Sequence, residues 1–297
     1  MVNSYVTLLV LAGGASIAGL FGSLLGVGGG MFIVPMLVLG FHLPMKSAVA
    51  ASIVSVIATS NAGGSSYVDQ RITNLKLAMF LEVFTTAGAI VGSLLALHAH
   101  EWVMLLVFAL VLLYLAYANF ATRSLDDRKI RNDEFATGTQ DAITRFLNLR
   151  GVYKDKAANR AVNYVVTGGY AGPAISLLAG ITSGMLGVGG GVLKVSAMNR
   201  YMNVPMKVAV GTSKLMIGIT AAVSAAVFLV AGLIQFALVA PIAIGTTLGA
   251  TLGTSIMNRL HSSTLKWIFS VLVLYISYSM LAKALGERFG LLLPGIG

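Results

Sequence analysis

The sequence predicts an all-α polytopic membrane protein with two homologous four-segment halves, arranged as inverted repeats that each begin with a glycine-broken, hairpin-like helix. Three observations predict this fold: an apolar composition, a series of apolar segments of membrane-spanning length, and a glycine-rich motif that occurs once in each half. In secondary transporters, repeats of this kind carry discontinuous helices whose breaks surround the substrate site.

Composition places the chain in a lipid bilayer. Of its 297 residues, 57% are hydrophobic and only 10% are charged, whereas about 25% of the residues of a soluble domain are charged. The net charge of +10 comes from basic residues in a central loop and at segment ends, so we expect no nucleic-acid partner. The absence of Cys and the scattering of the four His residues predict no metal, no cofactor and no enzymatic activity.

Eight segments reach the length of about 20 residues that a membrane-spanning helix needs. They are 3–21, 47–66, 76–97, 102–121, 163–186, 208–231, 235–257 and 264–285. Two shorter apolar pieces, 31–40 and 192–203, follow the glycine motifs. The first residues lack the basic region of a signal peptide, so we assign them to the first span.

These segments divide the chain into a first membrane repeat at 1–121, a linker loop at 122–162 and a second membrane repeat at 163–297. The linker is rich in basic residues, which predicts that it is cytoplasmic. Part of it has apolar residues at helical spacing: Ala142, Ile143, Phe146, Leu147 and Leu149. This pattern is compatible with a helix on the membrane surface and equally with a solvated linker.

Charge distribution favours inverted halves. If 3–40 and 163–203 each enter the bilayer, break and return to the same side, most basic segment ends become cytoplasmic, as the positive-inside rule requires. Those ends are Arg71, Lys76, Arg200, Lys207, Arg259 and Lys266, and only Lys46, Lys283 and Arg288 stay outside. Both termini then lie outside. If the glycine segments cross instead, the halves are parallel and five basic residues violate the rule.

The repeated motif itself predicts a binding site. Ser23–Gly30 returns as Gly184–Gly191, and Pro-Met-Lys follows at the same distance, at Pro44–Lys46 and Pro205–Lys207. Unwound backbone in a membrane is tolerated only when it is buried in protein or lines a wet cavity. The restarting helices would offer N–H groups and positive dipole ends to an anion. The candidate glycines are Gly28, Gly29, Gly30, Gly189, Gly190 and Gly191; tight helix packing is the alternative.

Two lysines distinguish the second half from the first. When the motifs are superimposed, Lys194 aligns with Ile33 and Lys214 aligns with Ile53. A lysine deep in a membrane costs about 2.5 kcal/mol or more unless it is paired or hydrated. We therefore expect an electropositive pocket for a small anionic substrate, with snorkelling to the interface as the alternative.

Polar residues complete the predicted site. Candidates for lining it are Ser52, Ser213, Asn61 and Thr212, although hydroxyls in membrane helices often bond to their own backbone. Glu82 lies well inside a predicted span. It would relay a proton for coupling, neutralise a lysine until substrate binds, or form a structural salt bridge.

The motifs together resemble the sulfite exporter TauE/SafE family, also described as the 4-toluenesulfonate uptake permeases. The resemblance rests on two copies of Leu-Gly-Val-Gly-Gly-Gly, on Pro35, and on Pro-Met-Lys-x-Ala-Val downstream of each copy. The second half departs from the first at Ser196, which matches Pro35.

The resemblance implies a multi-pass permease of the bacterial or archaeal inner membrane. It would export sulfur-containing anions such as sulfite, sulfoacetate or isethionate by alternating access, driven by an ion gradient without ATP. The alternative is an anion channel or a permease for sulfate, thiosulfate or a carboxylate, which would work as an importer. The sequence leaves open the anion, the direction, the coupling ion, the oligomeric state and the role of the linker.

Overall fold

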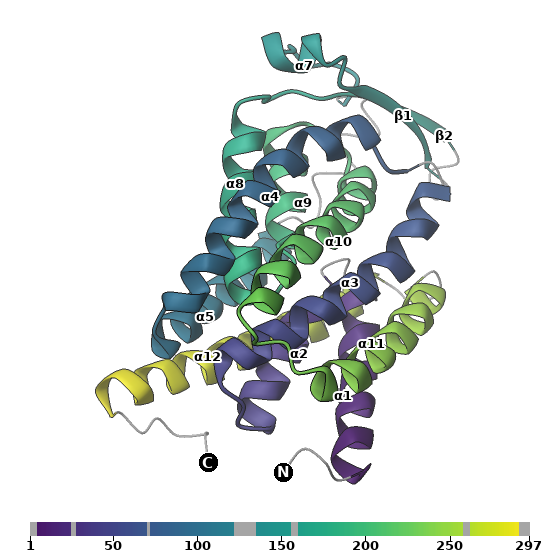
Figure 1. The fold of residues 1–297 in the computed structure, drawn as a ribbon. Coiled ribbons are helices and arrows are strands. Elements are labelled where there is room, and N and C mark those ends of the chain that lie inside the picture. Colours follow the sequence, from purple (N-terminus) through teal and green to yellow (C-terminus); the bar gives the residue numbers. More distant parts are fainter. Residues whose placement is uncertain are drawn as a thin grey trace.

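The computed structural model describes residues 5–24, 28–69, 72–121, 135–155, 160–257 and 262–290. The fold is predominantly helical, with one small β-hairpin (Figure 1). Several residues used above, namely Arg71, Arg259, the linker residues 122–134 and positions 25–27 of the first glycine motif, lie outside the described residues.

Six helical elements lie among the described residues of the first half. They are α1 (Tyr5–Leu24), α2 (Gly30–Pro35), the π-helix η1 (Met36–Gly40), α3 (Met45–Asp69), α4 (Leu75–His98) and α5 (Glu101–Ala121). The second half repeats the series with α8 (Ala171–Leu186), α9 (Gly191–Tyr201), α10 (Met206–Val230), α11 (Phe236–Met257) and α12 (Ser262–Phe289).

Four helical stretches among the described residues have the length and apolar composition to cross a membrane. They are Tyr5–Ser23, Leu75–His98, Met206–Val230 and Phe236–Gly253, and three shorter apolar helices cover Gly30–Gly40, Glu101–Tyr117 and Ala171–Leu186. The segment 47–66 forms α3 but carries many Ser, Thr, Asn and Gly residues, which explains why it does not reach the same hydropathy.

Two helix pairs join the halves through glycine. A Cβ atom on Gly88 of α4 would collide with the Leu177 carbonyl of α8, and one on Gly180 of α8 would collide with the Thr85 carbonyl of α4. The two backbones therefore pack directly on each other, as glycine allows. In Figure 1, α4 and α8 lie side by side although they belong to different halves.

The same arrangement recurs between α1 and α11, with the roles of the halves exchanged. A Cβ atom on Gly249 would meet the Ser16 carbonyl, and one on Gly19 would meet the Thr246 carbonyl. These four residues correspond, in order, to Gly88, Leu177, Gly180 and Thr85 at the offset that aligns Gly28 with Gly189. The duplication is thus present in the packing as well as in the sequence.

The loops after α2–η1 and after α9 also match. His42 and Asn203, which correspond at the same offset, both have positive φ angles, of 52° and 53°. One hydrogen bond closes each loop at 3.0 Å, from the Leu43 N–H to the Leu37 carbonyl and from the Val204 N–H to the Met198 carbonyl.

Pro35 breaks this correspondence. Proline lacks an N–H group and cannot complete the α-helical bonding pattern, and the chain continues from it as the π-helical turn η1. Ser196, in the corresponding place, lies within the uninterrupted helix α9. Lys283 of α12 donates to the Val38 carbonyl of η1 over 3.1 Å, so the irregular turn is held by a long-range hydrogen bond.

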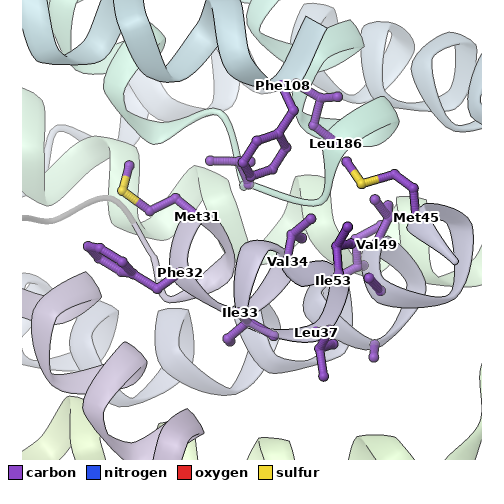
Figure 2. Close-up of a cluster of buried hydrophobic side chains, with 14 of the residues drawn as sticks. Met31, Phe32, Ile33, Val34, Leu37, Met45, Val49, Ile53, Phe108 and Leu186 are labelled. Atoms are coloured by element: carbon purple, nitrogen blue, oxygen red, sulfur yellow. The ribbon is translucent and has the colours of Figure 1, made fainter. Parts of the chain in front are cut away.

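Apolar side chains form two clusters. The larger one surrounds α2, and Figure 2 shows its members from α2, α3, α5 and α8 gathered together. The second joins the linker to the starts of α4 and α10 and to α9, through buried residues such as Leu77, Tyr164, Met202 and Val208.

The described part of the linker contains a short helix and the start of a β-hairpin. Among these described residues, the helix is α7 (Ala142–Phe146), in which Phe146 is 88% exposed. It is followed by an antiparallel hairpin of β1 (Arg150–Asp155) and β2 (Arg160–Val165). Leu149 is buried in the second cluster rather than on a helical face. The span expected at 163–186 consequently begins as a helix only at Ala171.

Candidate functional site

The two glycine breaks lie against each other in the interior. The Ser52 hydroxyl of α3 donates to the Gly187 carbonyl over 2.8 Å, and a Cβ atom on Gly30 would collide with the same carbonyl. Gly28 and Gly189 both have positive φ angles, of 82° and 79°, and both face the side chain of Val56. The sequence analysis predicted a binding site at the breaks, with tight packing as the alternative, and the structure shows close backbone contact between them.

The helices restart on glycine in both halves. Gly29 is the N-cap of α2 and Gly190 is the N-cap of α9, so neither helix start has a side-chain cap. The Ser213 hydroxyl of α10 donates to the Gly191 carbonyl over 3.2 Å. Ser52 and Ser213 are both fully buried, and each hydroxyl holds a glycine carbonyl at the second break.

Lys194 is fully buried on α9 beside a carboxylate of the other half. Its Nζ atom lies 2.7 Å from Thr220 Oγ1 and 3.9 Å from Glu82 Oε2. The Thr220 hydroxyl lies 2.7 Å from Glu82 Oε1. These three side chains, which we call the buried triad, come from α9, α10 and α4.

Glu82 also receives hydrogen bonds from its own helix. The hydroxyls of Thr85 and Thr86 lie 2.8 Å from Oε2 and 3.2 Å from Oε1, respectively. A buried carboxylate is tolerated when it is paired and hydrogen-bonded, and both conditions hold here.

Lys214 has a different environment. Its side chain is 4% exposed, its Nζ atom lies 3.4 Å from the Ser23 carbonyl, and the Tyr67 ring centroid is 4.9 Å away. No carboxylate of the described residues lies within 4.0 Å of this ammonium group. The Ser23 carbonyl at the end of α1 and the face of the Tyr67 ring therefore take the place of a counter-ion.

A small cavity adjoins Lys214. Its volume is about 10 Å³, roughly the space of one water molecule. It is lined by Gly22, Ser23, Gly28, Thr59, Ser60, Lys214 and Ile217. The cavity thus lies where the first glycine break, α3 and α10 meet.

Two predicted residues lie elsewhere. Thr212 is buried, but its hydroxyl accepts the Asn74 N–H over 3.0 Å at the start of α4. Asn61 is exposed on α3. Tyr67 was not selected from the sequence, since only the packing of α3 on α10 brings its ring to Lys214.

The buried triad has no counterpart in the other half. At the offset that aligns the glycine motifs, Lys194, Thr220 and Glu82 correspond to Ile33, Thr59 and Ala243. Only one of the two equivalent places therefore carries charge.

Comparison with known proteins agrees with these observations. The family model described as sulfite exporter TauE/SafE matches residues 11–280. The chain belongs to the sulfite exporter TauE/SafE family. The matched residues include both glycine breaks, Lys194, Lys214 and Glu82.

Two curated relatives come from Bacillus subtilis (strain 168). The probable membrane transporter protein YunE is 23% identical over 95% of this chain and 99% of its own length. The probable membrane transporter protein YdhB is also 23% identical, over 82% of this chain and 87% of its own. No solved structure matches this TauE/SafE chain. Together with the apolar helices, these relatives identify a multi-pass membrane protein of a transporter family.

Proposed function

We propose that this protein is a secondary transporter that exports sulfur-containing anions, such as sulfite or the organosulfonates sulfoacetate and isethionate, driven by an ion gradient. The observation that carries the proposal is Lys214, a buried ammonium group at a glycine break with no carboxylate of the described residues within 4.0 Å. Sulfite export is the activity in the family's description.

The surroundings of Lys214 suit a small oxyanion. A buried ammonium group is costly in a membrane unless it is paired. Binding of an anion beside it would therefore offset this free-energy cost. Thr59 and Ser60 line the same cavity, where their hydroxyls donate to the Val56 and Lys214 carbonyls; each has one proton to donate and would have to turn to reach sulfonate or sulfite oxygens. Charge selects anions here, and rotation of the two hydroxyls toward the cavity would favour oxyanions among them.

The size of the cavity supports alternating access. A space of about 10 Å³ holds roughly one water molecule and is too small for a sulfonate group. Substrate binding therefore requires α3, α10 and the end of α1 to move apart. A site that is too small until helices move fits a transporter better than a permanently open channel.

The path of the chain supports inverted repeats with hairpin-like first segments. In Figure 1, α1 enters the helical body from the lower side and α2 with η1 turns back, while α8 enters from the opposite side and α9 turns back. The linker hairpin lies on the upper side, and the first turns of α1 and the end of α12 lie on the lower side. This arrangement favours a cytoplasmic linker and external termini.

Flux into proteoliposomes tests the proposal. The purified protein is assayed with sulfite, isethionate, sulfoacetate, sulfate, acetate and a cation, and we expect saturable flux of one sulfur-anion class. Unsaturable flux would identify a channel, and selectivity for sulfate or acetate would identify the alternative permease. Flux of the cation alone, or of nothing, would contradict an anion transporter.

The Lys214→Ala variant tests the site. We expect flux to fall by at least about tenfold, equivalent to about 1.4 kcal/mol, while the elution profile in detergent stays that of the unaltered protein. Lys76→Ala is the matched control, because Lys76 is an exposed lysine in the first turn of α4. Near-normal flux in Lys214→Ala would remove this residue from the site.

A further inference from the structure

The buried triad contains one negative and one positive group that are sealed in the interior together. Lys194 is 0% exposed at its side chain and Glu82 is 9% exposed. The carboxylate is thus the member of the pair that lies nearer the surface. While both groups are ionised, the pair has no net charge.

The hydroxyls around Glu82 suit two protonation states. Thr85, Thr86 and Thr220 all place hydroxyl oxygens at hydrogen-bonding distance from the carboxylate. A hydroxyl donates to an ionised carboxylate and can instead accept from a protonated one. The same side chains therefore solvate Glu82 with or without a proton.

Few other ionisable groups lie on α4, α8, α9 and α10, the helices around Glu82. Helix α8 contains no Asp, Glu, His, Lys or Arg. On α10 these groups are Lys207 and Lys214, and Lys214 is directed to the Ser23 carbonyl. On α9, apart from Lys194, only Arg200 and Tyr201 at its end are ionisable. On α4 itself, Lys76 and His98 lie at the two ends. Lys194 is thus the charged partner of Glu82 among the described residues.

Helix α10 connects the buried triad to the anion cavity. Lys214 at the cavity and Thr220 in the triad are six residues apart on this helix, which corresponds to about 9 Å along its axis. Charges at this separation interact strongly in a membrane interior because little water screens them.

We propose that Glu82 binds the proton that moves with the transported anion; this inference rests on the proposed function. One proton adds to a carboxylate oxygen, and the charge of Glu82 changes from −1 to 0. The triad then has a net charge of +1, from the Lys194 ammonium group. This charge favours an anion in the neighbouring cavity. When the anion leaves, the proton is released from the same oxygen and the neutral pair is restored.

One proton therefore accompanies one negative charge in the same direction. For a monovalent sulfonate the cycle is electroneutral, so the outward gradient of the anion itself drives export and carries one proton out with each anion, whereas a larger inward proton gradient reverses the cycle to uptake. A gradient of about one pH unit then sustains about a tenfold anion gradient, because each pH unit corresponds to a factor of ten.

The test compares exchange with accumulation in proteoliposomes, using isethionate as the probe and sulfite in parallel. Glu82→Gln keeps the shape and hydrogen bonding of a protonated carboxyl group but cannot release a proton. We expect it to exchange labelled anion at a rate within about threefold of the unaltered protein, and to lose accumulation driven by a pH gradient. Glu101→Gln is the matched control, because Glu101 lies at the start of α5, outside the triad, and it should accumulate anion normally.

A measurement on the unaltered protein avoids any dependence on variant folding. A pH dye inside the vesicles should report one proton entering with each isethionate, and an imposed potassium diffusion potential should not change the flux. Isethionate flux without proton movement, or accumulation retained by Glu82→Gln, would overturn the proton site and leave the proposed function intact. No flux of any sulfur anion in the unaltered protein would instead contradict the proposed function.

Discussion

Ser52 and Gly187 join the two glycine breaks, since the Ser52 hydroxyl donates to the Gly187 carbonyl over 2.8 Å across the interface between the halves. Gly30 approaches the same carbonyl so closely that a Cβ atom would collide with it. The breaks are therefore held in contact by one hydrogen bond and one missing side chain.

Gly30→Ala should destabilise the protein. Forcing a methyl group into packed backbone typically costs about 1–3 kcal/mol, so we expect a lower melting temperature in detergent and reduced flux. Gly40→Ala is the control, because a Cβ atom there meets nothing within 4 Å. An unchanged melting temperature in Gly30→Ala would contradict the described contact.

Two glycines of α1 should respond in opposite ways to the same substitution. Gly19→Ala would collide with the Thr246 backbone of α11, whereas Gly13 has open space around its Cβ position. Gly13→Ala should keep or raise stability, because alanine is favoured over glycine in a helix by about 1 kcal/mol. Thermal unfolding in detergent measures both. Equal effects of the two substitutions would argue against close packing of α1 on α11.

The helix breaks at the glycine motifs were predictable because they depend only on the residues of the motif itself. A Gly-x-Gly-Gly-Gly sequence disfavours a continuous helix. In the structure one helix ends before each copy and the next begins at its last glycine, as α1 and α2 do in the first half and α8 and α9 in the second. The packing of α4 on α8 was not predictable, because it depends on which glycines face which backbone. The sequence analysis accordingly treated the halves as separate repeats, and the helix pairs cross that boundary.

A disulfide between α3 and α10 should stop transport. A Cβ atom on Gly218 would lie 3.3 Å from Ser60 Cβ, close to the separation found in disulfides. The chain contains no cysteine, so Ser60→Cys with Gly218→Cys creates the only possible pair. We expect oxidation to abolish flux and reduction to restore it.

The two single-cysteine variants are the controls for this experiment, and their flux should not respond to oxidant. If the oxidised pair forms, as judged by protection from thiol labelling, and transport continues, α3 and α10 do not separate during the cycle.

Asp141 should stabilise the linker in a pH-dependent way. Partial burial raises the pKa of its carboxyl group, but hydrogen bonds from the Thr144 side chain and from the Thr144 and Gly169 N–H groups outweigh this effect and lower the pKa below its usual value. Its stabilising effect is therefore complete above the unfolded-state pKa of about 3.9. It is lost as the pH falls through the lower folded-state pKa.

Limited proteolysis measures this effect. At neutral pH, Asp141→Ala should be cleaved in the linker faster than the unaltered protein, because α7 loses an N-cap worth about 1 kcal/mol. With an acid protease below the folded-state pKa, the difference should shrink. Thr139→Ala, an exposed neighbour, is the control; a difference that persists unchanged in acid would assign the effect to something other than the carboxylate.

The linker hairpin shows what the sequence analysis missed and why. Val162, Tyr164 and Val166 are buried at every second position, which is the period of a half-buried strand. Because Tyr164 and Val166 adjoin a long apolar run, they were assigned to the span 163–186, while Val162 was left in the linker. An alternating apolar pattern that directly precedes a continuous apolar run is easily mistaken for the beginning of that run.

The charged residues stood out from the sequence as a set, but their partners could not be assigned from it. Lys194, Lys214 and Glu82 stand out in an apolar chain because each is costly there. Whether Glu82 lies beside Lys194 or Lys214 depends on the crossing of α4 with α9 and α10, which no local pattern encodes. The roles of these residues in binding and coupling stay predictions.

The exchange of helices between the halves also bears on how the chain is made. Helices α1 and α4 are synthesised before α11 and α8, the partners that their glycine faces require. Until the second half enters the membrane, those faces have only lipid or chaperones to cover them. Neither half is then a self-sufficient folding unit, and fragments cut at the linker would have to be produced together to assemble.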